Sequence, residues 1–161
     1  MAKLEISQSL AQQFEPKRQN RFFVEIDGVP SWMVKTFQRP KPANGTIEID
    51  YINVKRYLAG KTTFGTVTLT LHDPLEKSAA QAIQAWQKAV YDPATGRAGY
   101  SDDYTKTIVV KELSPANDIV SETVFHRAYP TDVDFGSYDY ASAEPIEISL
   151  TIQYDSYEVI S

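Results

Sequence analysis

The sequence of 161 residues contains no cysteine, so disulfides, thiolate metal ligands and cysteine nucleophiles are all excluded. It also lacks any run of apolar residues close to the ~20 that a membrane-spanning helix requires. The N-terminus has no basic patch followed by an apolar stretch, which is the pattern of a secretory signal. We therefore expect a protein that needs neither an oxidising compartment nor a membrane.

Basic residues are scarce relative to acidic ones, with 16 Lys and Arg against 21 Asp and Glu and a formal net charge of -5. The corresponding pI is about 5.0. Proteins that grip nucleic acid draw much of their affinity from clustered Lys and Arg at the phosphates. The charge balance therefore argues against a nucleic-acid-binding protein, and solubility is the simplest explanation of the acidic excess.

Residues with catalytic or metal-binding potential are few. The histidines are His72 and His126, and their spacing does not suit a shared metal ion. Asp132, Asp134 and Asp139 lack the glycine and distal glutamate of a calcium-binding loop, so a solvated acidic loop is the favoured interpretation. Nucleophile elbows, phosphate-binding loops and dinucleotide fingerprints are absent. The sequence predicts no catalytic residue, no cofactor and no metal site, and hence a protein that is not an enzyme.

Alternation of apolar and polar residues is the strongest pattern in the sequence, and it predicts β-strands. The last such run is the clearest, because Ile148, Leu150 and Ile152 alternate with polar residues. Residues 39–45 hold two prolines and a glycine, so they are expected to be irregular. The predicted strands cover residues 21–27, 31–37, 46–53, 64–72, 104–113, 119–129 and 146–154.

One helix is predicted over residues 74–90. Asp73 is a suitable N-cap, Pro74 suits the first helical position, and Glu76 completes a capping-box-like pattern. Apolar residues then recur at spacings of three and four, which places them on one face of the helix. These residues are Leu75, Ala79, Ala82, Ile83, Trp86 and Val90.

The pattern as a whole predicts one mainly β domain over residues 21–161, preceded by a polar N-terminal arm over residues 1–20. Its architecture is expected to be an antiparallel β-sandwich or a distorted barrel with the single helix packed on the sheet. Residues 131–145 are expected to form a polar loop. Residues 53–64 carry both charged and apolar groups and are expected to form a protruding loop or hairpin.

Several segments of the chain match a known family in their order and spacing. They are Asn20–Arg21–Phe22 at the start of a strand, NVKRYLAGKTTF at 53–64, the strand–helix pair with Trp86, YPTDV at 129–133 and IEISLTIQYDSYE at 146–158. Together they resemble the tail tube proteins of contractile-tailed bacteriophages. Members of that family often carry glycine two residues before the aromatic–proline pair, where this chain has Arg127.

The resemblance implies a structural subunit that forms six-fold rings, which stack into a tube inside a contractile sheath. It implies a virion tail protein assembled in the bacterial host cytoplasm, with no cofactor and no active site. The implied partners are further copies of the chain, the tail sheath protein, a baseplate or tube initiator, and a tail terminator. DNA would pass through the channel without specific binding. The tubes of type VI secretion and of phage-tail-like bacteriocins are similar, so a subunit of such an injection system, or a tube initiator, is the alternative.

A polar strand face is a candidate lining for such a channel. A lumen that lets DNA pass should avoid Lys and Arg, because each contact with a phosphate releases counterions and adds binding. The alternative is that this face simply meets solvent on a monomer. The candidate lumen-facing residues are Thr66, Thr68, Thr70, Glu147, Ser149, Thr151 and Gln153.

The segment at 53–64 is the candidate for contacts between subunits or rings. Its apolar side chains would be exposed on a monomer and buried on a neighbouring copy, while its basic residues would set register. A hairpin folded onto its own sheet is the alternative. The candidate contact residues are Asn53, Lys55, Arg56, Tyr57, Leu58 and Lys61.

A function of another class also fits a β-sandwich. A monomeric binding module, for example for carbohydrate, would present a planar aromatic platform on one strand face. The ten tyrosines of the chain fit either a protein with much contact surface or an ordinary sheet protein.

Overall fold

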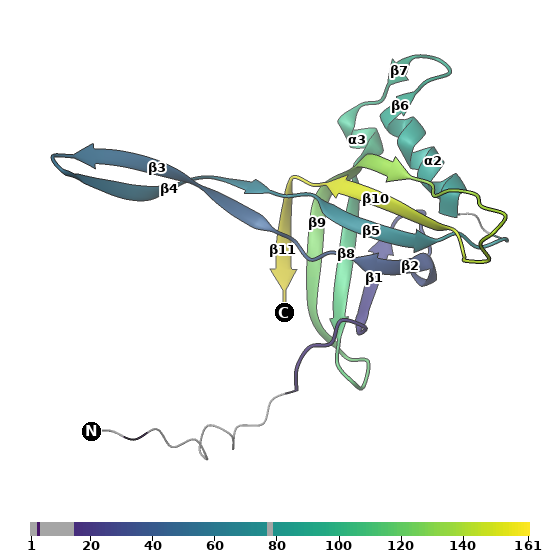
Figure 1. Cartoon of the computed structure of the whole chain (residues 1–161), viewed down its shortest axis with the longest axis horizontal. Coiled ribbons are helices and arrows are strands. Elements are labelled where there is room, and N and C mark those ends of the chain that lie inside the picture. Colours follow the sequence, from purple (N-terminus) through teal and green to yellow (C-terminus); the bar gives the residue numbers. More distant parts are fainter. Residues whose placement is uncertain (1–2, 4–14, 77–78) are drawn as a thin grey trace.

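The computed structural model describes residue 3, residues 15–76 and residues 79–161. The described chain is mainly β and antiparallel, as predicted (Figure 1). Its elements are β1 (Phe22–Ile26), the 3-10 helix η1 (Ser31–Met33), β2 (Val34–Phe37), β3 (Pro42–Tyr51), β4 (Val54–Phe64), β5 (Val67–His72), α2 (Ala79–Val90), β6 (Tyr91–Asp92), β7 (Arg97–Ala98), α3 (Ser101–Tyr104), β8 (Lys106–Leu113), β9 (Ile119–Asp134), β10 (Glu147–Gln153) and β11 (Ser156–Ile160). Most of the predicted arm over 1–20 lies outside the described residues.

The long strand β9 joins two halves of one bent sheet. Its first part pairs with β8 and β11, and β8 in turn pairs with β1. Its last part pairs with β10, which continues through β5 to β2. The register of β9 shifts twice against β8 and once against β10. Bulges of this kind bend a strand and let it pass from one sheet to the next.

The core lies between the two halves. Alternate residues of β5 and β10 point into it, and all of them are buried. Phe125 of β9 and Tyr154 pack edge to face there, with ring centroids 4.9 Å apart. Each fully buried apolar side chain stabilises the fold by roughly 1.5–3 kcal/mol. The inward set predicted from alternation is thereby confirmed for Val67, Leu69, Leu71, Ile148, Leu150, Ile152 and Tyr154.

The helix is present, but its predicted start is wrong. Residues 73–76 are not helical, residues 77–78 lie outside the described residues, and α2 is assigned from Ala79. The amide of Asp73 donates to the Ile146 carbonyl at 3.3 Å, which holds this residue against the neighbouring loop. Leu75, predicted on the buried stripe, is fully exposed.

The N-terminal cap nevertheless comes from the predicted residue. The Asp73 carboxylate accepts a hydrogen bond from the amide of Ala80 at 3.5 Å. A carboxylate near the first turn satisfies a helix N–H and favours the positive end of the helix dipole. Asp73 is therefore not the N-cap of a helix starting at 74, as predicted, but its carboxylate contacts the first described turn of α2.

Trp86 holds the helical part onto the sheet, as predicted from the apolar stripe. It is buried, and its indole nitrogen donates to the Tyr104 carbonyl of α3 at 2.6 Å. The Lys106 ammonium lies 5.1 Å from the ring centroid, a cation–π geometry. One side chain thus connects α2, α3 and the start of β8.

The structure departs from the predicted elements at four further segments. Residues 42–45 begin β3, because Pro42 occupies the first strand position, where a missing N–H is tolerated. Residues 131–134 belong to β9, so the polar loop starts later than predicted. Ser156–Ile160 form β11, a strand that the alternation pattern did not reveal. In addition, Ser101–Tyr104 form the short helix α3.

Truncation of Trp86 tests this packing. Trp86→Ala should lower the free energy of unfolding by roughly 3–5 kcal/mol, because it leaves a cavity between helix and sheet. Chemical denaturation of the monomer measures the change. Tyr100→Ala, at an exposed aromatic, is the matched control and should change stability by less than about 0.5 kcal/mol. An unchanged midpoint for Trp86→Ala would contradict the packing.

Candidate functional site

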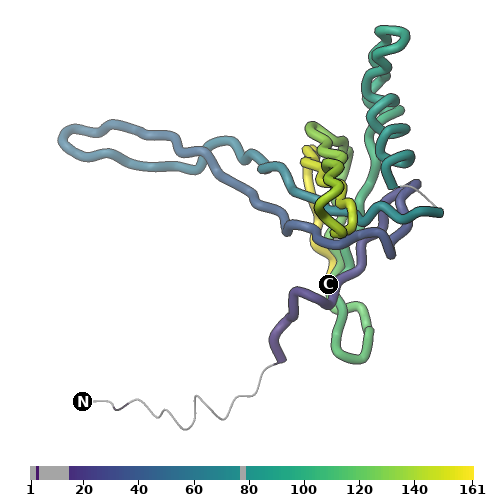
Figure 2. Tube along the Cα trace, turned by 45° about the vertical axis from the view of Figure 1, so that its right-hand side comes forward, coloured from purple at the N-terminus to yellow at the C-terminus, as the bar shows by residue number. Residues whose placement is uncertain are grey.

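The β3–β4 hairpin projects far from the rest of the molecule (Figures 1 and 2). Its strands pair from Pro42 opposite Phe64 to Tyr51 opposite Val54. All of β3 is exposed, and so is most of β4. Residues 53–64 protrude as predicted, but they form the tip and second strand of a hairpin that begins at Pro42 rather than a loop or hairpin of their own. The alternative of a hairpin folded onto its own sheet is wrong.

Two glycines let the hairpin strands approach closely where their register shifts. A Cβ on Gly45 would lie 3.2 Å from the Lys61 carbonyl oxygen, and one on Gly60 would lie 3.3 Å from the Gly45 carbonyl carbon. The shift falls between Asn44 and Thr46. Larger residues here would force the strands apart, so the glycines fix the shape of the outer half of the hairpin.

The outer half of the hairpin has one apolar face and one charged face. Cross-strand partners share a face, so the pairs Ile47 with Leu58 and Tyr51 with Val54 make one face largely apolar, with Arg56 opposite Ile49 between them. Its large apolar side chains are between 44% and 63% exposed. Exposed apolar surface of this extent is typical of an interaction site. The apolar face consists of Ile47, Ile49, Tyr51, Val54 and Leu58.

The candidate contact residues divide between the two faces and the tip. Leu58 and Arg56 lie on the apolar side, whereas Tyr57 and Lys55 lie on the charged side. Tyr57 and Leu58, predicted to act together, therefore point in opposite directions, because adjacent strand residues alternate. Lys55 pairs with Glu48 on its own face at 3.5 Å. Asn53 lies in the turn at the tip, and Lys61 lies at the register shift.

The candidate lumen-facing residues come together on one face of the sheet. Thr70 is opposite Ser149, and Thr68 is opposite Thr151, so their side chains share the face that points away from the core. All four are partly or fully exposed. The predicted shared polar face is confirmed.

The remaining candidates lie at the margins of this face. Thr66 immediately precedes β5 and is exposed. Glu147 pairs in register with His72. The Gln153 side-chain amide donates to the Phe64 carbonyl at 3.1 Å, so it ties the base of the hairpin to β10.

Three charged residues of the polar face were missed by the sequence analysis. Asp132 and Asp134 lie opposite Thr151 and Ser149, although they were predicted to lie in a solvated loop. The alternation Asp132–Val133–Asp134 could have revealed them as strand residues. Lys35 of β2 reaches across the sheet and pairs with Glu147. The hydrogen bond and charge of Lys35 lower the pKa of the Glu147 carboxyl.

A crevice of about 450 Å³ opens beside the free edges of β1 and β2. Aromatic side chains including Phe22, Phe37 and Phe125 line its apolar part. Glu112 stands at its rim, 2.6 Å from the Lys17 ammonium and 3.4 Å from the Arg39 guanidinium. Lys17 first, and Arg39 more weakly, hold the pKa of Glu112 below its ordinary value. These pairs anchor the segment before β1 and the link from β2 to the hairpin.

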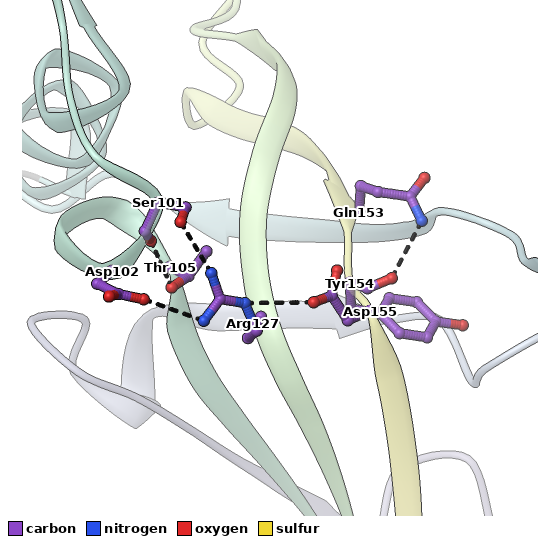
Figure 3. A network of polar contacts seen from close by, with 7 residues as sticks. All are labelled: Ser101, Asp102, Thr105, Arg127, Gln153, Tyr154 and Asp155. Atoms are coloured by element: carbon purple, nitrogen blue, oxygen red, sulfur yellow. Dashed lines mark hydrogen bonds and ion pairs between the residues drawn. The ribbon is translucent and has the colours of Figure 1, made fainter.

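Arg127 occupies a left-handed backbone conformation at the bend of β9, with φ of 54°. Its guanidinium reaches three partners (Figure 3): Asp102 at 3.1 Å, the Ser101 hydroxyl at 2.9 Å and Asp155 at 3.2 Å. The network connects α3, β9 and the turn between β10 and β11. Only glycine adopts this φ without cost, so the backbone is strained at Arg127, and the guanidinium of this residue ties the strained bend to α3 and to Asp155.

A family model described as phage tail tube protein matches residues 9–160 of the chain. The chain belongs to this family. The resemblance predicted from the sequence is thereby confirmed. No curated protein sequence matches the chain at a significant level. Among the residues that the structure describes, no helix is both long and apolar enough to cross a membrane.

Solved tube proteins share the fold of this tail tube protein. A chain of the anti-feeding prophage cap, which terminates its tube, is 18% identical with a TM-score of 0.77, over 98% of this chain and 99% of that chain. A chain of the sheath–tube complex of the extracellular contractile injection system PVC is 16% identical with a TM-score of 0.72, over 99% of both. Hcp1 from Flavobacterium johnsoniae is 15% identical with a TM-score of 0.55, over 86% of this chain and 94% of that chain.

Substitution of Arg127 separates backbone strain from ion pairing. Arg127→Ala and Arg127→Gly both remove the guanidinium, but only glycine relieves the left-handed backbone, a cost of ~1–2 kcal/mol. Because glycine also gains freedom in the unfolded chain, Arg127→Gly should be more stable than Arg127→Ala by about 0.5–1 kcal/mol. Denaturant unfolding of both variants measures the difference. If Arg127→Ala proved the more stable, the account of backbone strain would be wrong.

Proposed function

We propose that the chain is the structural subunit of a phage tail tube, in which six-fold rings stack into a hollow tube that passes DNA during ejection. It has no catalytic role and no cofactor. The observation that carries the proposal is the projecting hairpin, whose apolar face no described part of its own chain covers. Such a face gains stability only when another molecule covers it. A further copy of the same chain meets this requirement in a tube.

Ring formation needs sheet edges that are free in the single copy. In the part of the chain that the structure describes, β2 pairs only with β5, and the last part of β9 pairs only with β10. These edges lie on opposite sides of the same half of the sheet. Pairing β2 of one copy with β9 of the next would satisfy both edges and continue the sheet around a closed barrel. The contact joins two different surfaces, and it gives a closed ring where the rotation from one copy to the next completes a full turn.

The polar face of β5 and β10 would then line the channel. Its small hydroxyl side chains offer little to hold DNA, and Asp132 and Asp134 add negative charge that repels phosphate. Lys35, the cation that reaches this face, is paired with Glu147. DNA would pass with few of the cation–phosphate contacts that produce binding.

The partners and location follow from the family. Solved relatives come from an anti-feeding prophage baseplate and from PVC assemblies of sheath with tube and of the sheath/tube terminator. For this chain we propose corresponding partners: a tail sheath protein, a baseplate or tube initiator, and a tail terminator. We place it in the virion tail, assembled in the bacterial host cytoplasm without a membrane.

A second candidate is the tube subunit of a phage-derived injection or secretion system, or a tube initiator. The similarity of fold to chains from the anti-feeding prophage, PVC and Hcp1 supports this second candidate. Both candidates build a tube and differ in what passes through. A monomeric binding module, by contrast, has no use for a long hairpin with an uncovered apolar face.

Electron microscopy of the purified protein over a range of concentrations tests the proposed function. We expect six-fold rings and, at high concentration, stacked tubes with an open channel. A protein that stays monomeric at every concentration, and that adds to no pre-formed tail structure, would overturn the proposal.

Cations placed on the polar face test the channel. In Thr68→Lys with Thr151→Lys, rings should still form, because these side chains lie outside the core. DNA ejection from particles carrying the variant should slow, and added salt should restore it by screening the new charges. The matched control is Thr68→Gln with Thr151→Gln, which adds similar bulk without charge. Normal ejection by the lysine variant at low salt would show that the face does not line the channel.

Polar substitutions on the hairpin test its role in assembly. Ile47→Ser with Leu58→Ser removes a cross-strand pair from the apolar face and should abolish tube extension. The melting temperature of the monomer should change little, because both side chains are exposed. Tyr57→Ser on the opposite face is the control, and it should extend tubes better than the double variant. Unfolding, or normal polymerisation, of the double variant would contradict the assignment.

A further inference from the structure

A second uncovered apolar surface lies at the other end of the sheet from the hairpin. Two segments form it, residues 73–76 and residues 135–146, which we call the loop end. They are adjacent, because the Asp73 amide donates to the Ile146 carbonyl at 3.3 Å. Leu75, Tyr138 and Tyr140 are at least 94% exposed there. Large apolar side chains this exposed have no packing role within the described chain.

The hairpin and the loop end lie at opposite ends of the strands β5 and β10. The hairpin is inserted between the end of β2 and the beginning of β5. The loop end follows the end of β5 and precedes the beginning of β10. Because β5 runs from one to the other, the two surfaces face opposite ways along the same sheet (Figure 1).

The two surfaces also carry opposite charge. Residues 73–76 and 135–146 contain four acidic side chains, Asp73, Glu76, Asp139 and Glu144, and no Lys or Arg. Residues 42–64 contain three basic and two acidic side chains, and one acid–base pair, Glu48 with Lys55, is already formed within the hairpin. The basic side chains that remain for a partner are Arg56 and Lys61. Opposite charge favours correct docking and register between two surfaces.

We propose that the loop end is the acceptor for the hairpin of a second copy of this chain. This rests on the proposed tube function and names the surface that the hairpin covers. Tyr138 and Tyr140 pack on the apolar face of the hairpin, and Arg56 and Lys61 lie toward Asp139 and Glu144. Each copy thus carries a donor at one end and an acceptor at the other. Such a heterologous contact repeats without limit along one direction, which gives the stack of subunits its polarity.

Cysteine cross-linking tests the contact, because the native chain has no cysteine and only introduced thiols can react. Subunits with Val54→Cys on the hairpin are mixed with subunits carrying Tyr140→Cys, assembled, and treated with a short bismaleimide. We expect a cross-link between positions 54 and 140 in tubes and none at monomer concentrations. Tyr100→Cys, at another exposed tyrosine, replaces Tyr140→Cys in the control and should give no cross-link.

Removal of the Tyr138 and Tyr140 side chains tests the same contact independently, through its effect on tube extension. Tyr138→Ser with Tyr140→Ser should keep the melting temperature of the parent but raise the protein concentration needed for tube extension by at least about tenfold. Tyr100→Ser, the matched control, should extend tubes like the parent.

The outcomes separate this inference from the proposed function. If the parent forms tubes but position 54 fails to link to position 140, or the double tyrosine variant extends normally, the acceptor is elsewhere and the tube function stands. If the parent forms no rings or tubes at all, the proposed function fails and the acceptor surface fails with it.

Discussion

The apolar face of the β3–β4 hairpin has no cover within the described chain. The proposed assembly of subunits depends on this uncovered face. A two-stranded hairpin is at best marginally stable in water by itself. Here it is paired along almost its whole length, yet its apolar side chains remain about half exposed. The body of the protein can hold the base of the hairpin in place but cannot bury its outer half. The proposed tube supplies the missing contacts from a neighbouring copy.

The body of the protein anchors the base of this hairpin and leaves its outer half exposed. The hairpin connects the end of β2 to the start of β5. The side-chain amide of Gln153 in β10 donates to the Phe64 carbonyl at its base. The core beneath contains fully buried residues from both halves of the sheet. The bend of β9 that joins these halves requires a strained backbone at Arg127, and the ion pairs of that residue tie the bend to α3 and to Asp155. The strained residue and its ion-pair partners therefore lie together at the bend. The edges of β2 and of the last part of β9 have no strand partner within the described chain.

The sequence predicted much of the fold because alternation and burial agree in the central strands. The inward residues of β5 and β10 and the burial of Trp86 all follow from period-two and helical patterns. Other features depend on contacts that the pattern does not contain. Residues 73–76 are not helical although Asp73 has the sequence of a cap, and the contact of Asp73 with Ile146 joins segments 73 residues apart. Asp132 and Asp134 lie in a strand because β10 supplies the partner that their polar stretch lacks locally.

The sequence predicted where the candidate contact segment lies, but not which of its side chains share a face. The segment at 53–64 was recognised from its mixture of charged and apolar residues, and it does project. The pairing register, however, decides that Leu58 joins Ile47 and that Tyr57 faces the other way. Register is a property of two strands together, and the partner strand includes residues 42–45, which the prolines and glycine had marked as irregular. A single segment read alone could not show which of its residues share a face.

Hydrogen exchange of the hairpin amides, compared between single subunits and assembled tubes, tests the central claim most directly. In single subunits the amides of β3 and β4 should exchange quickly, because little apolar packing resists opening of the hairpin. In tubes the same amides should exchange at least about tenfold more slowly, while those of β10 are protected in both states. Equal exchange of the hairpin in both states would show that no neighbouring copy covers it, and would contradict the account.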